Sequence, residues 1–126
     1  IETHTIENKV SLIKCCAGME SDILDFYIDA GYKGIIIEAL GRGNIPPAMI
    51  TGVKKAIDKG IPVVMVSRCP TGRVLDTYGY EGGGRHLREL GVIFGKNLPG
   101  QKARIKLMLI LGLTNDLDII RNIFED

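Results

Sequence analysis

The polar loop at residues 41–44 carries the residue types in this chain that are best suited to bind a small ligand. It reads Gly-Arg-Gly-Asn and lies between the branched apolar run Ile35–Ala39 and the pair Pro46-Pro47. Glycines let the backbone turn sharply and approach a ligand, and the amide of Asn44 offers both a donor and an acceptor. Because a tight turn requires neither Arg42 nor Asn44, the pattern favours a binding role over turn formation alone.

Two further polar loops have the same placement, directly after an apolar run. Residues 67–72, Ser-Arg-Cys-Pro-Thr-Gly, follow the run Pro62–Val66, and residues 17–19 follow the run Val10–Cys15. Loops that lead from parallel strands into helices emerge at one edge of the sheet. We therefore expect the three loops to share a ligand edge; the alternative is ordinary turn chemistry, in which the glycines serve only the turns.

Side chains that could act as a nucleophile or a base do not form a recognisable set. Hydroxyl groups are present at Ser67, Thr71 and Thr77, and His86 is the one histidine outside the polar N-terminus. His86 lies beside two arginines in a helical register, so we expect a surface residue rather than a base. No combination of nucleophile, base and orienting acid follows from the sequence, and the isolated chain is not predicted to be a complete enzyme.

The cysteines do not indicate a metal site. Cys15, Cys16 and Cys69 are an odd number, with neither a CxxC spacing nor a histidine cluster. We therefore expect no zinc site and no disulfide framework. Cys15 and Cys16 are predicted to be small core residues, and a reducing cytosol is the expected setting.

No cofactor is predicted either. The loop at residues 41–44 lacks the Lys-Ser/Thr pair of a Walker loop and the third glycine of a dinucleotide fingerprint. The stretch 80–85, Tyr-Glu-Gly-Gly-Gly-Arg, precedes an expected helix whose start could bind an anion. Nucleotide binding at that stretch is retained as an alternative.

Size and charge limit the classes of function. A chain of 126 residues supports one domain with one core, and a net charge of +1 gives no nucleic-acid footprint. The longest apolar run is far shorter than a bilayer span, and the polar start lacks an apolar signal segment, so we expect no membrane association and no signal peptide. Because the first residue is Ile rather than Met, we expect a fragment or a processed product.

Apolar runs alternate with amphipathic stretches along the chain. Residues 91–95 are a further short strand, and helices are expected over residues 20–30, from Pro46-Pro47 to Gly60, and over 81–90, 101–111 and 115–124. Ser21 is predicted to help cap the first helix, and Thr114 or Asn115 the last. Strands separated by helices require crossover connections, so the sheet should be parallel and covered on both faces. The predicted architecture is a single α/β domain, a three-layer α/β/α sandwich with a small, Rossmann-like parallel sheet.

Three strings along the chain resemble one known family. They are GYKGIIIEALGRGNIPP (31–47), IPVVMVSRCPTGRV (61–74) and GQKARIKLMLILG (100–112). Together they are similar to the C-terminal domain of bacterial-type L-asparaginases, in the right order and spacing from about Val10 to Phe124. The most specific pieces are the loop that ends in Asn44, the loop at residues 67–72 and the QKAR helix start at Gln101–Arg104. Cys69 and the residues 78–80 look more like the cytoplasmic type I branch than the secreted type II branch.

The resemblance implies an amidohydrolase of linear amides that converts L-asparagine and water to L-aspartate and ammonia, with L-glutamine as an alternative substrate. It places the nucleophilic threonine in an N-terminal domain that this chain lacks. Residues 1–126 would then be the smaller, C-terminal domain, without a catalytic residue and inactive alone. The implied full-length protein is a cytoplasmic homodimer or homotetramer that needs no metal or cofactor and binds neither nucleic acid nor membrane.

The resemblance also implies roles for particular residues. Asn44 aligns with the asparagine that completes the active site of a neighbouring subunit, and Arg42 and Gly43 belong to the same loop. Glu81 lies near the place of an acidic residue that binds the ammonium group of the substrate in the type II branch. A regulatory asparagine site of some type I members is lined by the loop whose matching residues are Arg68, Cys69 and Thr71.

Two other functions remain open at this point. One is the equivalent domain of an asparaginase-like subunit of a tRNA-dependent amidotransferase, for which the balanced charge gives no support from RNA contact. The other is a non-enzymatic module for ligand binding or dimerisation.

Overall fold

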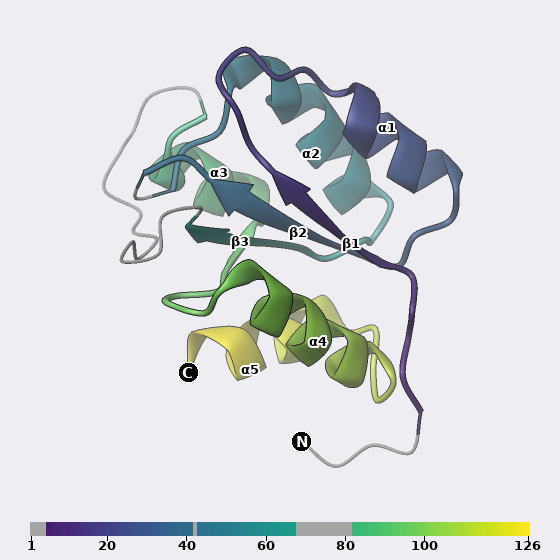
Figure 1. Ribbon diagram of the computed structural model, residues 1–126. Helices are drawn as coiled ribbons and strands as arrows, with labels where there is room; N and C mark the ends of the chain where they lie inside the picture. The colour runs from purple at the N-terminus through teal and green to yellow at the C-terminus, as the bar shows by residue number, and fades with distance from the viewer. Residues whose placement is uncertain (1–4, 42, 68–81) are drawn as a thin grey trace.

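A computed structural model of the chain describes residues 5–41, 43–67 and 82–126. In it, a four-stranded sheet with the strand order β1-β2-β3-β4 runs through the centre of the molecule (Figure 1). The strands are β1 (Val10–Lys14), β2 (Gly34–Ala39), β3 (Val63–Ser67) and β4 (Ile93–Phe94). Every neighbouring pair is parallel, which confirms the predicted small parallel sheet.

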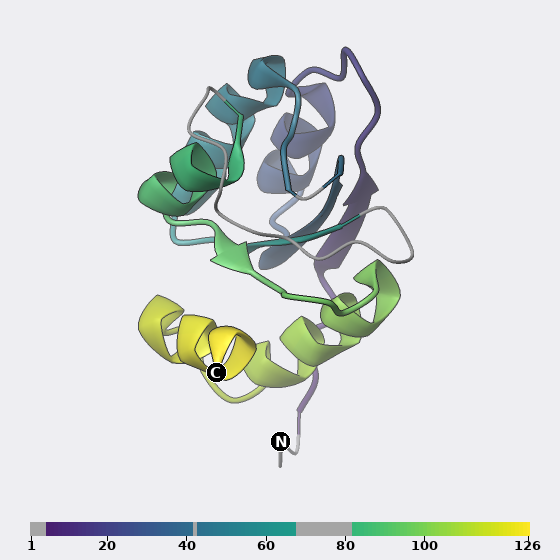
Figure 2. The same ribbon diagram turned by 90° about the vertical axis from the view of Figure 1, so that its left-hand side faces the viewer.

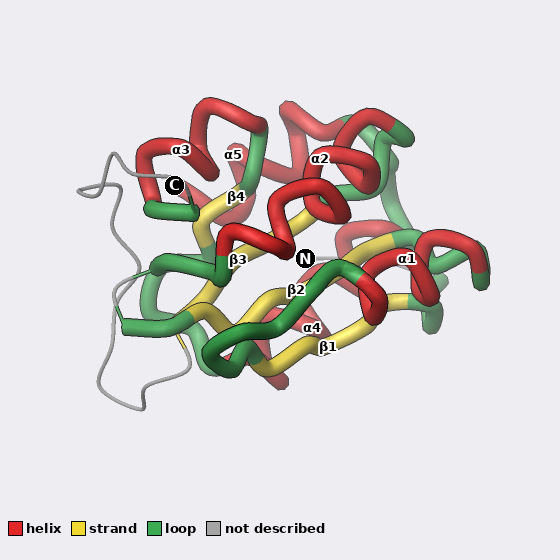
Figure 3. The backbone as a smooth tube through the Cα atoms, turned by 90° about the horizontal axis from the view of Figure 1, so that it is seen from above, coloured by secondary structure: helices red, strands yellow, loops and turns green. Residues whose placement is uncertain are grey.

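Helices cover both faces of this sheet (Figures 1 and 2). One layer consists of α1 (Asp22–Asp29), α2 (Ile50–Asp58) and α3 (Gly84–Leu90), and the short 3₁₀ turn η1 (Pro47–Met49) leads into α2. The other layer consists of α4 (Gly100–Leu111) and α5 (Leu117–Glu125). Seen from above, α1, α2 and α3 succeed one another across the sheet in the same sequence as the strands that precede them (Figure 3). The three-layer α/β/α sandwich is therefore confirmed.

The alternation of side chains along β2 divides the interior into two apolar clusters. Ile35 and Ile37 pack with residues of the first helical layer, including Leu24 of α1. Ile36, which points to the opposite face, packs with Leu107 of α4. All three isoleucines are almost fully buried. A continuous run of branched residues is what a strand needs when it is covered on both sides.

Within the described residues, no helix is both long enough and apolar enough to cross a bilayer.

Several predicted boundaries and caps are wrong. The third helix starts at Gly84 rather than at residue 81, and the fourth strand is two residues long rather than five. Asp116, not Thr114 or Asn115, caps α5: its Oδ1 accepts hydrogen bonds from the backbone nitrogens of Asp118 (2.9 Å) and Ile119 (3.2 Å). Asp116 stands directly before the first helical residue, where an N-cap must be placed to reach these donors.

Ser21 occupies the N-cap position of α1 but does not cap it. Its hydroxyl donates to the carbonyl oxygen of Ala48 (2.8 Å) and accepts from the backbone nitrogen of Gly52 (3.0 Å). The prediction of a local cap is wrong because tertiary contact with η1 and α2 takes both hydrogen bonds of this side chain.

Candidate functional site

The loops that follow β2 and β3 meet at the carboxyl edge of the sheet. Ser67 ends β3, and its hydroxyl donates a hydrogen bond to the carbonyl oxygen of Gly41, 2.7 Å away. Ser67 is buried and Gly41 is exposed, so the contact joins the sheet to the surface loop. The expectation that these two loops share one edge is confirmed for the residues that the structure describes.

The loop after β2 closes into a tight turn. Leu40 and Asn44 form an isolated antiparallel bridge, in which the nitrogen of Leu40 donates to the carbonyl oxygen of Asn44 at 2.9 Å. The carbonyl oxygen of Leu40 accepts from the nitrogens of Gly43 and Asn44, at 3.0 and 3.1 Å. Gly41 and Gly43 have φ values of +51° and +118°, which strain any residue with a side chain. The glycines are therefore explained by the turn itself.

The side chain of Asn44 does more than close this turn. Its Nδ2 donates to the carbonyl oxygen of Leu40 (3.2 Å), which fixes the orientation of the amide. No described residue forms a hydrogen bond with the other end of the amide, the Oδ1 atom, and the side chain is only half-buried. Asn44 thus presents a fixed acceptor at the carboxyl edge, where an ammonium group or a hydroxyl could donate to it.

The strand-like segment after Asn44 is paired with the start of α3. The nitrogen of Ile45 donates to the carbonyl oxygen of Gly82 (2.9 Å). The nitrogen of Gly82 in turn donates to Nδ1 of His86 (3.2 Å). His86 is half-buried. The prediction of a simple surface histidine is therefore wrong, and the residue belongs to the structure around the loop.

The structure places only some of the predicted site residues. Gly43 is buried and Asn44 is half-buried, in the turn described above. The remaining predicted residues lie outside the described residues: Arg42, Arg68, Cys69, Thr71, Thr77 and Glu81. Of the adjacent cysteines, Cys15 is buried, with its Sγ 3.7 Å from Sδ of Met49, whereas Cys16 is exposed and not a core residue as predicted. Among the described residues, no group of histidine, cysteine and carboxylate side chains could hold a metal ion.

Glu38 is an acidic residue near the same edge that the sequence argument did not single out. It lies in β2 on the face opposite to Ile37, toward α4, and is half-buried. A Cβ added to Gly100, the first residue of α4, would lie 2.8 Å from the carboxyl carbon of Glu38. The positive end of a helix dipole favours a carboxylate at this place. The alternation along β2 is the signal that could have located it.

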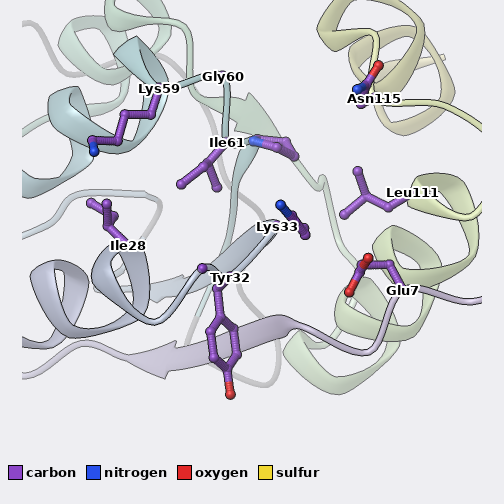
Figure 4. A pocket seen from close by; sticks show the side chains of 11 residues that line it. Glu7, Ile28, Tyr32, Lys33, Lys59, Gly60, Ile61, Leu111 and Asn115 are labelled. Carbon is purple, nitrogen blue, oxygen red and sulfur yellow. The ribbon is translucent and has the colours of Figure 1, made fainter.

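A hollow of about 510 Å³ opens at the opposite edge of the sheet. Its lining includes Lys33, which precedes β2, and Pro62, which precedes β3, together with Glu7, Ile61 and Leu111 (Figure 4). Ligands of open parallel sheets bind beyond the carboxyl ends of the strands. This hollow lies at the amino ends, so it is separate from the loop of Asn44.

The geometry defines a class of protein before any comparison is made. A three-layer sandwich with a parallel sheet, and with polar loops meeting at its carboxyl edge, is a Rossmann-like ligand-binding domain. The chain belongs to the family described as the glutaminase/asparaginase C-terminal domain, whose model matches residues 9–124. The family resemblance inferred from the three strings is thereby confirmed at this level.

The curated relatives have one name in common, that of the D-type subunit of a glutamyl-tRNA(Gln) amidotransferase. The chain is 44% identical over 113 residues to this protein from Pyrococcus furiosus, covering 89% of this chain and 25% of the relative. It is 40% identical over 120 residues to the protein of the same name from Methanopyrus kandleri, covering 94% of this chain and 26% of the relative. It is 42% identical over 113 residues to that from Methanobrevibacter smithii, with 89% and 25% covered.

These relatives correct the emphasis of the sequence analysis. The chain spans about a quarter of the length of the curated relatives it matches. Their name agrees with the amidotransferase alternative rather than with the free-standing L-asparaginase that the strings led us to expect.

Proposed function

We propose that the chain is the C-terminal domain of an asparaginase-type amidohydrolase that releases ammonia for a tRNA-dependent amidotransferase. One observation carries this proposal: 44% identity over 89% of the chain to a protein named as a glutamyl-tRNA(Gln) amidotransferase component. The reaction is hydrolysis of a side-chain amide, in which water adds to the amide carbon and ammonia leaves. L-Glutamine and L-asparagine are the candidate amides.

Within this function, Asn44 is the residue that the geometry supports best. Its Oδ1 is held outward by the bond from Nδ2 to Leu40 and has no hydrogen-bond partner among the described residues. An amino-acid substrate offers an ammonium group that could donate to this oxygen, and fixed acceptors of this kind orient a substrate without a metal or cofactor. Gly43 permits the turn.

The other predicted residues are proposals that rest on the family resemblance. Arg42 and Glu81 would contact the substrate near Asn44, and Arg68, Cys69 and Thr71 would line a regulatory loop. The nucleophilic threonine would lie in a further, N-terminal domain of the full-length polypeptide. We also propose that this polypeptide is a cytoplasmic homodimer or homotetramer in which Asn44 completes the site of a neighbouring subunit.

A free-standing L-asparaginase is the second candidate. The near-balanced charge of the chain, +1, favours it because RNA-binding surfaces are usually strongly basic. A non-enzymatic module for dimerisation is the third reading.

Ammonia release separates these functions. The measurement compares the 126-residue chain with the full-length polypeptide that carries it, on L-asparagine and L-glutamine, with and without glutamyl-tRNA(Gln). The proposal predicts no activity of the chain alone and, for the full-length protein with its complex, ammonia release stimulated by the glutamyl-tRNA. Rapid hydrolysis of asparagine that is indifferent to tRNA would instead establish the asparaginase. Absence of any amidase activity in the full-length protein would favour the binding module.

A further inference from the structure

His86 is tied to the candidate site by two consecutive hydrogen bonds. Nδ1 of His86 accepts from the nitrogen of Gly82 at 3.2 Å, and the carbonyl oxygen of Gly82 accepts from the nitrogen of Ile45 at 2.9 Å. Ile45 directly follows Asn44 in the chain. The imidazole is thus one short segment of backbone away from the amide that we propose to contact the substrate.

The first of these bonds fixes the protonation of the ring. A backbone nitrogen can only donate, so Nδ1 must carry its lone pair, and the hydrogen of the neutral imidazole is on Nε2. This assignment follows from the partner, because the bond exists only in that tautomer.

The second bond lies at a very close approach between two backbone segments. Gly82 has a φ of +84°, and a Cβ added there would lie 2.3 Å from the carbonyl oxygen of Ile45. Gly82 and Gly83 are both buried. The position of Gly82 therefore determines how closely the segment after Asn44 can approach α3.

The helix that carries His86 is anchored in the apolar core. Leu87, the next residue, is 1% exposed and packs in the cluster beneath the first helical layer. Its carbonyl oxygen accepts from the nitrogen of Val92, which leads into β4. The helix is short, but its core contact gives His86 a fixed base from which to hold Gly82.

From this arrangement we infer that His86 is a positioning residue: through Gly82 and Ile45, its Nδ1 holds the Asn44 loop in the conformation that the active site requires. The consequence for activity rests on the proposed function, whereas the consequence for the loop does not. The competing explanation is that His86 stabilises only its own turn, since Gly82 and His86 are four residues apart.

Two substitutions distinguish these explanations. His86→Asn keeps an acceptor, because Oδ1 of asparagine can take the place of Nδ1, whereas His86→Leu removes it. Arg85→Ala, which changes an exposed side chain of the same helix, is the matched control. The amide of Val92 reports whether α3 is intact in each variant.

The first measurement is amide hydrogen exchange in the 126-residue chain. We expect exchange at Ile45 and Gly82 to be about tenfold faster in His86→Leu, close to the unsubstituted rate in His86→Asn and Arg85→Ala, and unchanged at Val92. Nitrogen NMR of the imidazole should show an unprotonated Nδ1 and a protonated Nε2. Unchanged exchange at Ile45 in His86→Leu, or His86→Asn no better than His86→Leu, would overturn the inference.

The second measurement concerns the full-length protein. Loss of loop positioning should raise the KM for the amide substrate more than it lowers kcat, with His86→Asn restoring most of the affinity. If exchange at Ile45 responds as expected but the KM does not, His86 positions the loop and the role proposed for Asn44 fails. The two failures are therefore distinguishable.

Discussion

The hydroxyl of Ser67 donates a hydrogen bond to the carbonyl oxygen of Gly41 across 2.7 Å. Ser67 is the last residue of β3, and Gly41 begins the turn that ends at Asn44. The bond therefore links a buried strand to the loop that presents the proposed substrate contact. Since both strands end at this edge, a single side chain is enough to relate the two loops.

Replacing Ser67 by alanine should loosen this loop without unfolding the sheet. The variant loses the bond to Gly41, whose carbonyl is exposed and can turn to water, so we expect a decrease of about 1 kcal/mol in the free energy of unfolding. Exchange of the Gly43 and Asn44 amides should become faster. Urea denaturation and hydrogen exchange measure the two effects.

Ser11 provides the control for this prediction. It is 4% exposed in β1, and its hydroxyl has no hydrogen-bond partner among the described residues. A buried unpaired hydroxyl is unfavourable, so Ser11→Ala should leave stability unchanged or raise it. Equal losses in both variants would show that the bond from Ser67 to Gly41 contributes nothing.

A comparison of Gly82→Ala with Gly60→Ala measures how closely the Asn44 segment approaches α3. Both glycines have similar positive φ values, +84° and +78°, so both substitutions carry a backbone cost of about 1 kcal/mol. Only at Gly82 would the new methyl meet another atom, the carbonyl oxygen of Ile45. We expect about 2 kcal/mol of additional destabilisation at Gly82, from the clash, in thermal or urea unfolding. Similar losses at the two positions would contradict the close approach.

Asp116→Ala should weaken the last helix. The carboxylate accepts from the nitrogens of Asp118 and Ile119, and removal of such a cap costs about 1 kcal/mol. Asn115→Ala is the control, because Asn115 was the cap expected from sequence and makes no capping bond in the structure; its effect should stay within about 0.5 kcal/mol. Urea denaturation followed by circular dichroism compares them, and a larger loss in Asn115→Ala would reverse the assignment.

The fold could be predicted because its signals are local and periodic. The run at residues 35–37 requires burial on both faces, and the glycines at residues 31 and 60 end helices with positive φ. Capping could not be predicted as well, because several polar residues compete within one turn. Ser21 shows the limit most clearly, since its hydroxyl is bound by residues about thirty positions later in the chain.

The site was only partly predictable for a similar reason. Asn44 could be found because an asparagine in a glycine loop after an apolar run has no need of its amide for the turn alone. His86 was missed because its partner is a backbone nitrogen of Gly82, and only the fold brings Gly82 against Ile45. Glu38 was missed because its environment depends on α4, which lies more than sixty residues further along the chain.

Asn44→Ala should separate function from stability in the full-length protein. Two backbone donors also bind the carbonyl oxygen of Leu40, so the turn should survive loss of Nδ2 with a cost of about 1 kcal/mol or less. Removal of a fixed polar contact at a reacting centre, however, commonly lowers kcat/KM by about 100-fold or more. Asn44→Asp keeps an acceptor oxygen and should retain more affinity for a substrate ammonium group than Asn44→Ala. Asn122→Ala, an exposed residue of α5, is the control and should leave kcat/KM unchanged. Ammonia release measures all three variants, and full activity of Asn44→Ala would remove Asn44 from the active site.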